Sequence, residues 1–567
     1  MKKESEPCGN SFPGSIGRSG LLSVADPRVC LLLAVLLAYV LWPVLQALAE
    51  SFWNPLTGWT LEPWREFARR GHWIYALRSL AISLASVALA GIVGVLLALL
   101  YYRLEFPGRA LLLGLTLLPF ALPPLVGVFS IWMLMGEEGP FNTLTRALLG
   151  RAMGFDKGYG GVLLVHTYSM YVYFFVLVGG AIANFDESQL EAARDLGAGR
   201  LRAFTSVLLP QLLPAVGGAA LLTFMNSMAS FTAPFFYLTG KPVLTVGVQQ
   251  ALDESATGLA SCDCVVLVIC AGLFLCLALR FERIFSPGGR GPARRRVAPC
   301  SALAGWSLTA GAAVLTLLIV LPHLWMARQS LIQPGTDFIG VPVRYTFSNC
   351  LSLAKREESL RPILNSLRAS SAATVAVVLF ALLSAWMTVR HKFNGRGAVQ
   401  ALVMVPWALP GTVIAVGLLR ITRQPGLLTA GTDLRGTIAI LSMAYFIRLL
   451  PLAHRTLAAG LAQAPVDLEG AARDLGATPR QAFLRVTAPL LLPAILAAST
   501  LIFVTAMGEF VSSILLQGPG SEPIAVKIDQ LRRGPGGMHV AAAYSTILLA
   551  MITLTFLCLG RRLRMTV

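Results

Sequence analysis

Two charged side chains, Glu509 and Arg448, lie deep inside apolar stretches of this sequence, where an ionised group is costly unless it has a partner or a function. Charges in such places line a route for polar solutes or bridge neighbouring helices, and both roles stay open. At 1.5 Å per helical residue, Glu509 lies about 25 Å and Arg448 roughly 10 Å from the cytoplasmic ends of the membrane spans that are predicted for them below. This difference in depth argues against a direct ion pair, and we expect Glu509 near the outer mouth. Ser230, which occupies the place of Glu509 in the repeat described below, is a third candidate for such a path.

The other chemistry-bearing residues form no recognisable catalytic or metal site. The six histidines are scattered, and Cys262 and Cys264 form a C-x-C pair without a second cluster of ligands. The sequence contains neither a phosphate-binding G-x-x-x-x-G-K-[ST] motif nor H-E-x-x-H. We therefore expect no catalytic residue, no metal and no cofactor in this chain. Because the sequence has no phosphate-binding loop, any hydrolysis of ATP, which requires Mg²⁺, must take place on separate subunits.

The composition requires a partly apolar solvent. Of the 567 residues, 56% are hydrophobic and 13% are charged, and the mean hydropathy is +0.69. Soluble domains carry about 25% charged residues, so a water-soluble enzyme is excluded. The net charge of +18 would favour nucleic acid in a soluble protein, but it is equally typical of cytoplasmic loops that retain Lys and Arg. We expect a lipid bilayer, and no nucleic acid, as the surrounding of this chain.

Apolar runs of about 20 residues predict an all-α polytopic membrane protein, because a backbone in hydrocarbon must satisfy its own hydrogen bonds. Twelve spans are expected near 29–50, 79–102, 110–135, 161–184, 211–238, 262–280, 301–327, 366–389, 397–420, 436–454, 489–515 and 541–560. Prolines interrupt the third span of each half, at Pro119 and Pro123 and at Pro406 and Pro410. Such breaks persist where the backbone lines a cavity or where neighbouring helices accommodate a kink.

Basic clusters predict the orientation. Three short clusters, Arg294–Arg296, Arg390–Lys392 and Arg561–Arg562, fall on the same side of the predicted spans, which the positive-inside rule makes cytoplasmic. Both termini are then cytoplasmic. The predicted domains are a polar cytoplasmic tail (1–28), a first six-span domain (29–280), a basic cytoplasmic linker (281–300) and a second six-span domain (301–567).

The two halves are an internal duplication. The seven residues Ala192–Ala198 recur without change as Ala471–Ala477, 279 positions later, and the same offset carries Phe231 onto Phe510. Around the prolines of the third span the offset is 287. Since each half has an even number of spans, both enter from the same side, and a pseudo-two-fold axis along the membrane normal relates them.

The repeated segment predicts a pair of short helices on the cytoplasmic side. Gly197 or Gly476 can supply a left-handed turn between them, and the second helix carries Phe204 or Phe483 on an apolar face. Such a pair can dock in a groove of another protein or lie on lipid headgroups. Its presence at the same place in both halves favours docking of a two-fold partner.

The segment Leu190–Ala198, running on to Pro210 and Pro214, resembles the Glu-Ala-Ala loop of the inner-membrane permeases of binding-protein-dependent ABC importers, and Leu468–Ala477 resembles it too. The match in register covers nearly all of residues 50–560, and two permease domains fused in one chain resemble the ferric-iron, thiamine and phosphonate branch of the type I family. The resemblance implies a bacterial inner-membrane location and alternating access. The implied partners are two ATP-binding cassette subunits and a periplasmic or lipid-anchored substrate-binding protein.

In that family the loop is the coupling helix, which fits a cleft of the ATP-hydrolysing subunit. The residues that the resemblance assigns to this contact are Glu191, Ala192, Ala193, Arg194, Asp195, Gly197 and Phe204 in the first half, and Glu469, Ala471, Ala472, Arg473, Asp474, Gly476 and Phe483 in the second.

One departure separates the two copies. The acidic position of the family falls on Glu191 in the first half but on Gly470 in the second, where Glu469 stands one residue earlier and about 100° around the helix. Either Glu469 takes over by a local shift or the two docking sites are unequal. We expect unequal contacts of similar geometry.

The function expected from these residues is that of the membrane subunit of an ATP-driven importer for a small solute. Ferric iron is the first expectation on the resemblance, with thiamine, phosphonates or polyamines as alternatives. A secondary transporter with two parallel halves is the rival interpretation, and its uptake would follow an ion gradient without ATP. A polytopic membrane enzyme would need clustered acid, base or metal-binding residues at one depth, which the sequence does not show.

Overall fold

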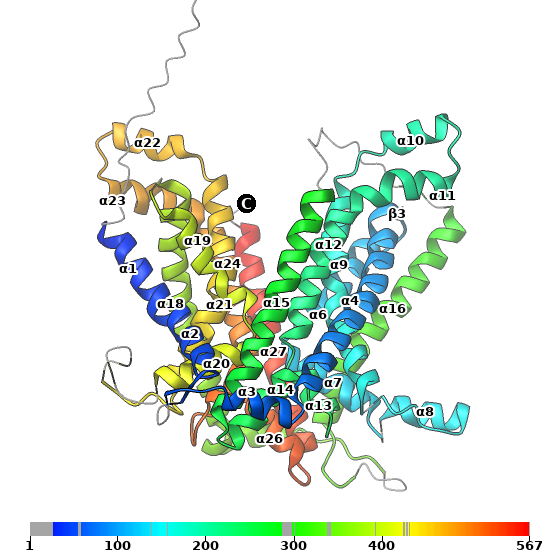
Figure 1. Ribbon diagram of the computed structural model, residues 1–567. Coiled ribbons are helices and arrows are strands. Elements are labelled where there is room, and N and C mark those ends of the chain that lie inside the picture. The colour runs from blue at the N-terminus through cyan, green and yellow to red at the C-terminus, as the bar shows by residue number, and fades with distance from the viewer. Residues whose placement is uncertain are drawn as a thin grey trace, which may run out of the picture.

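The apolar runs of the sequence fold into long helices, which the computed structural model arranges as two arms joined at one end (Figure 1). The structure describes residues 26–565, apart from 55–57, 138, 156, 286–297, 300, 337–341, 392, 423–425, 427–428 and 430. Most of the predicted tail (1–28) and linker (281–300), including Arg294–Arg296, therefore lies outside the described residues.

Ten helices of the described part are long and apolar enough to cross a membrane. They are α1–η1–α2 (Pro27–Leu36, Leu37–Leu41, Trp42–Ala49), α4 (His72–Arg103), α9 (Tyr159–Ala183), α11–η2–α12 (Arg200–Ala203, Phe204–Leu208, Leu209–Met228), α15 (Thr257–Phe285), α16 (Ala302–Ser330), α18 (Glu357–Arg390), α21 (Ile438–Gln463), α23–η4–α24 (Pro479–Ala482, Phe483–Thr487, Ala488–Met507) and α27 (Met538–Met565).

The third predicted span of each half is broken at a proline, as expected. In the second half, α19 (Arg396–Ala408) and α20 (Gly411–Ile421) meet at Pro410 with a bend of 105°, and the pair counts as an eleventh span. In the first half, the predicted span 110–135 falls on three shorter helices, α5 (Arg109–Thr116), α6 (Leu118–Ala121) and α7 (Pro124–Met135), with Pro123 preceding α7. The all-helical architecture of two repeated halves is confirmed.

Shorter elements connect these spans. The helices are α3 (Glu62–Arg69), α8 (Pro140–Leu149), α10 (Ser188–Asp195), α13 (Thr232–Tyr237), α14 (Leu244–Asp253), α17 (Ser348–Lys355), α22 (Val466–Asp474), α25 (Val511–Leu516) and α26 (Ile524–Arg533). Two-residue strands form an antiparallel pair, β1 (Trp53–Asn54) with β2 (Gly58–Trp59), and a parallel pair, β3 (Leu104–Glu105) with β4 (Ala298–Pro299).

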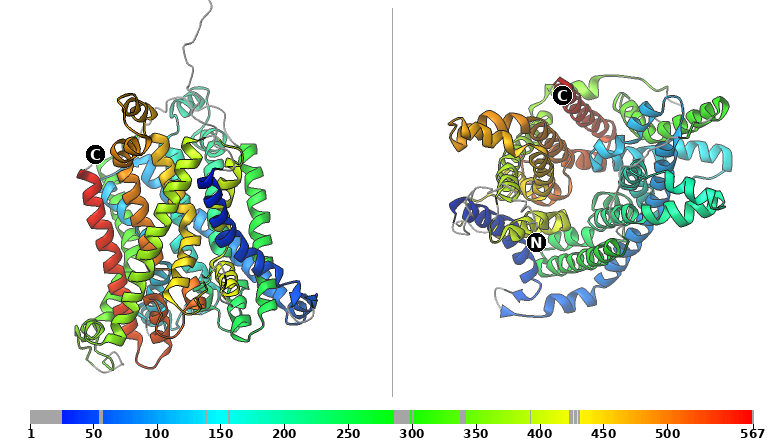
Figure 2. Two further views of the ribbon diagram at one scale, coloured as in Figure 1. Left: turned by 90° about the vertical axis from the view of Figure 1, so that its left-hand side faces the viewer. Right: turned by 90° about the horizontal axis from the view of Figure 1, so that it is seen from above.

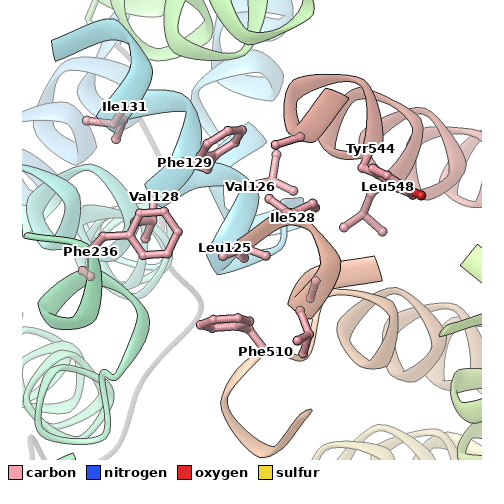
Figure 3. Packing of buried hydrophobic residues seen from close by; sticks show 14 of the residues in the cluster. Leu125, Val126, Val128, Phe129, Ile131, Phe236, Phe510, Ile528, Tyr544 and Leu548 are labelled. Atoms are coloured by element: carbon pink, nitrogen blue, oxygen red, sulfur yellow. The ribbon is translucent and has the colours of Figure 1, made fainter. Parts of the chain in front are cut away.

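The two arms separate toward the end that carries α10 and α22, which we call the arm end, and meet at the opposite, joined end (Figure 1). One buried cluster at the joined end combines α7 and α13 of the first half with α26 and α27 of the second. Figure 3 shows Leu125, Val126 and Phe129 of α7 gathered with Ile528, Tyr544 and Leu548. The joined end therefore has a continuous apolar core built by both halves.

The first span of each half packs on the other half. Val29, Leu32, Leu36 and Val40 of α1 and η1 are buried in the core of the second half, and Glu50 forms an ion pair with Arg420 at the end of α20. Conversely, α16 lies against α5 and α7 of the first half. Tyr168 of α9 also donates a hydrogen bond to the carbonyl of Ile319 on α16 at 2.8 Å. The packing thus crosses the predicted boundary at 281–300.

The duplication is visible as the same hydrogen bond in both halves. The backbone N–H of Leu244, which opens α14, donates to Ser79 Oγ at 3.0 Å. The N–H of Ile524, which opens α26, donates to Ser366 Oγ at 2.8 Å. Each serine satisfies an N–H group that has no partner within its own helix.

Candidate functional site

The repeated segments form the tips of the two arms. The helices α10 and α11 stand at one tip and α22 and α23 at the other, on opposite sides of the molecule when it is seen from above (Figure 2, right). Both tips, the start of α1 and the end of α27 lie at the arm end (Figure 1). The two elements are therefore placed so that one partner of two-fold symmetry, or two copies of one subunit, can contact both.

Each tip turns through a glycine in the left-handed conformation. Gly197 and Gly476 both have φ = +88°, a value that a residue with a Cβ rarely adopts. The N–H of Ala198 donates to the carbonyl of Ala193 at 3.0 Å and that of Gly197 to the carbonyl of Arg194 at 2.8 Å, the hydrogen-bond pattern of a Schellman turn. The second copy repeats both bonds, at 3.0 and 2.9 Å.

A leucine stands out at each turn. Leu196 is 89% exposed and Leu475 is 90% exposed, each directly before the glycine. Single exposed leucines are common, but their recurrence at the same turn of both tips makes these two candidates for a partner contact. These two leucines were missing from the residues predicted for the contact. The signal that could have found them is an apolar residue inside a heptapeptide that is otherwise small or charged.

The other predicted contact residues are arranged alike in both copies. Ala192, Arg194, Asp195 and Gly197 are exposed and Ala193 is half-buried, and the second copy has the same order: Ala471, Arg473, Asp474 and Gly476 are exposed and Ala472 is half-buried. The predicted apolar face is only partly accessible at Phe204 and Phe483. Both are half-buried, and Phe483 packs edge-on against Trp386 of α18, with the ring centroids 4.8 Å apart.

The two tips differ at the acidic position. Glu191 is exposed, whereas Glu469 is buried and accepts hydrogen bonds from Arg473 at 3.1 Å and from Thr487 at 3.3 Å. Glu469 occupies the place of the buried Leu190 in the other half, so it does not replace Glu191 by a local shift. The geometry of the two tips is the same, and their surface charge is not.

An arginine at the end of the second span holds each tip. Arg103 of α4 pairs with the carboxylate of Glu187 at 3.2 Å, directly before α10. Arg390 of α18, its counterpart at the offset of 287, donates to the carbonyl of Ala464 at 2.9 Å, two residues before α22. A force on either tip therefore reaches a helix that runs to the joined end.

Aromatic rings close the joined end around the pseudo-two-fold axis. Phe231 and Phe510 correspond to each other in the repeat, and their ring centroids lie 6.0 Å apart. Two corresponding residues can touch in this way when the axis passes between them. Farther along, the guanidinium of Arg532 lies 4.1 Å from the ring of Phe236 and 5.3 Å from that of Trp132, again between the halves.

Arg448 and Glu509 form a direct ion pair, contrary to the prediction from their depths. Arg448 Nη1 lies 3.1 Å from Glu509 Oε1. The error lies in the predicted span end: α21 continues to Gln463, so Arg448 is 463 − 448 = 15 residues from that end, about 22 Å instead of roughly 10 Å. Ser230 does not join the pair. It hydrogen-bonds with His166 Nε2 at 2.9 Å, within the first half.

The described residues offer no metal site. Among them, no group of three or more His, Cys, Asp or Glu side chains lies close enough to hold a metal ion. Cys262 and Cys264 are buried in α15 and unbridged. Among the described residues, the structure therefore brings together two exposed tips at the arm end and a polar pair beside an aromatic contact between the halves.

A family model agrees with this arrangement. The model of the binding-protein-dependent transport system inner membrane component matches residues 90–290 and 377–563, once in each half and over more than half of the chain. The chain belongs to this family. It is the permease of an ABC importer of the binding-protein-dependent type, a multi-pass protein of the inner membrane.

The relatives of this permease include proteins named for ferric transport and for thiamine transport. The probable ABC transporter permease protein y4fN of Sinorhizobium fredii is 26% identical over 545 residues, 93% of this chain and 94% of the relative. The ferric transport system permease protein FbpB of Actinobacillus pleuropneumoniae is 24% identical, over 84% of this chain and 70% of the relative. The thiamine transport system permease protein ThiP of Escherichia coli is 28% identical, over 59% and 60%.

Proposed function

We propose that this permease imports a small solute, with ferric iron as the first candidate, by alternating access driven by two separate ATP-binding cassette subunits. These subunits dock on the tips α10 and α22 on the cytoplasmic side, where both chain termini also lie. A periplasmic or lipid-anchored binding protein delivers the solute at the joined end. ATP and Mg²⁺ are bound by the cassette subunits.

The observation that carries the docking proposal is the pair of exposed leucines. Leu196 and Leu475 recur at the same turn of both tips, at 89% and 90% exposure, and each tip is tied by an arginine to a membrane-spanning helix. A conformational change needs contacts that differ between its two states, and docked tips supply them. A secondary transporter would have no use for such a paired, cytoplasmic docking surface.

The docking is tested by purifying the full chain together with the cassette subunit encoded beside it. We expect the double variant Leu196→Asp/Leu475→Asp to lose the cassette subunits on affinity purification, since a carboxylate cannot enter an apolar cleft at low cost. Leu148→Asp is the matched control, an exposed leucine of α8 near the joined end, and it should retain them. Retention of the cassette subunits by the double variant would refute the docking site.

Iron as the solute is supported by the ferric permease among the relatives, and thiamine is the alternative that the thiamine permease supports. The test is uptake into proteoliposomes of the complete importer, with the binding protein loaded with radioactive ferric iron or with thiamine. ATP-dependent accumulation of iron is expected. Accumulation of thiamine but not iron would replace the substrate, and uptake without ATP would support the secondary transporter.

A further inference from the structure

The ion pair of Arg448 and Glu509 belongs to one half only. At the offset of 279 the corresponding residues of the first half are Ser169 and Ser230, which carry no charge. The duplicated fold therefore forms without this pair in one of its two copies. An ionised pair in a membrane-spanning region is costly, so its presence in a single copy calls for a function other than folding.

The surroundings of Arg448 hold its guanidinium in place. Glu509 accepts from Arg448 Nη1 at 3.1 Å and from the backbone N–H of Ser512 at 3.1 Å, so the carboxylate is fixed at the start of α25. A methyl group at Gly411, the first residue of α20 after the Pro410 break, would collide with Arg448 Nη1. The chain thus leaves room for the guanidinium at the broken helix and fixes it from one side.

Exposure decides which charge a solute would meet. The side chain of Arg448 is 32% exposed, whereas that of Glu509 is 6% exposed, so the carboxylate lies behind the guanidinium. A guanidinium has five N–H donors, and among the described residues that of Arg448 donates to Glu509 alone. The remaining donors can bind a planar anionic group in the bidentate manner typical of arginine.

The site lies beside the closure between the halves. Glu509 directly precedes Phe510, whose ring lies 6.0 Å from Phe231 and 6.1 Å from Phe235 of the first half. A solute that passes between the halves would come within reach of Arg448 next to the aromatic closure.

We propose that Arg448 is a solute-binding residue of the transport path, and that it binds a carboxylate or phosphate group of the cargo. Glu509 is its positioning residue. This inference rests on the proposed function and narrows its substrate class. A bare ferric ion would be repelled by the exposed guanidinium, so ferric iron would cross in a complex with an anion that neutralises or exceeds its charge.

The test uses the full chain in lipid nanodiscs, without cassette subunits, and two probes, citrate and inorganic pyrophosphate, each alone and as its ferric complex. Binding is measured by isothermal titration at low salt. We expect saturable binding to the wild type and at least tenfold weaker binding to Arg448→Gln/Glu509→Gln, a double variant that leaves no unpaired buried charge. Arg448→Lys should bind with intermediate strength, since a lysine keeps the charge but not the fork geometry.

The matched control is Glu357→Gln/Arg361→Gln, which removes an Arg–Glu pair of the same length, 3.1 Å, from the start of α18. It should bind both probes as the wild type does. Equal binding by the Arg448/Glu509 variant and the wild type, equal losses in both double variants, or no binding by the wild type would each overturn the proposal. These outcomes do not depend on cassette docking, so they are distinguishable from a failure of the proposed function.

Discussion

The glycine turns at the tips allow a sharp test of the proposed contact with a cassette subunit. We expect Gly197→Val to weaken binding of the cassette subunit and Gly197→Asn to leave it nearly unchanged. Gly197 has φ = +88°, and a left-handed conformation costs an ordinary residue about 1–2 kcal/mol. Asparagine tolerates this conformation, whereas a β-branched residue is a true outlier there.

The structure separates backbone strain from steric collision. A Cβ added at Gly197 or Gly476 would meet no atom within 4 Å, so the cost of the valine lies in the backbone alone. The exposed turn can release that strain by unwinding, which displaces Leu196, and docking must then rebuild it. A cost of about 1–2 kcal/mol corresponds to roughly 5- to 30-fold weaker binding at each site.

The assay is a titration of the labelled cassette subunit against each variant in nanodiscs, followed by uptake in proteoliposomes. Membrane insertion and chromatographic behaviour should match the wild type, and the Gly476 variants should follow the Gly197 variants. Unchanged affinity for both valine variants would refute the reasoning. A loss as large for asparagine as for valine would show that side-chain bulk at the interface, rather than backbone conformation, is what the partner senses.

Three further predictions concern other parts of the permease. Arg532→Gln removes the contacts of the guanidinium with Trp132 and Phe236 of the other half, which are worth about 0.5–2 kcal/mol. ATP hydrolysis by the full importer without binding protein should therefore rise several-fold. An unchanged rate would mean that these contacts do not hold the joined end closed. Ser366→Ala leaves the N–H of Ile524 without its acceptor and should destabilise the chain by about 1–3 kcal/mol, seen as a lower melting temperature in detergent. Ser352→Ala is the control, because the Ser352 hydroxyl of α17 only donates to the carbonyl of Asn349 within its own helix. In the connection between α20 and α21, hydrogen bonds from Arg435 favour the ionised form of Asp433 and lower its pKa to about 2. Arg435→Gln should therefore raise the pKa of Asp433 toward about 4 in an NMR titration. No rise would disprove the pairing in solution.

The general architecture was predictable because it depends on hydropathy and on identity between the halves. Runs of apolar residues mark the spans regardless of their neighbours, and an unchanged heptapeptide at Ala192 and Ala471 marks both tips. The breaks at Pro123 and Pro410 follow from the missing N–H of proline. These features are local, so one sequence is enough to find them.

What could not be predicted depends on distant packing. The predicted span ends near residue 454, but α21 continues to Gln463. This difference hid the ion pair of Arg448 and Glu509. The half-burial of Phe204 and Phe483 depends on packing such as that of Phe483 on Trp386, a residue almost 100 positions earlier. Nor does an apolar helix indicate which half it will pack against.

The exchange of first spans has a consequence for biosynthesis. The segment from α1 to α2 leaves the ribosome long before the helices α19 and α20 that cover it, which begin at Arg396. At 5–20 residues per second, translation of the intervening chain takes roughly 20–70 s. During this interval Val29, Leu32 and Leu36 face lipid or an insertion factor. The first span therefore has to stay in the membrane without its packing partners until the last third of the chain has been synthesised.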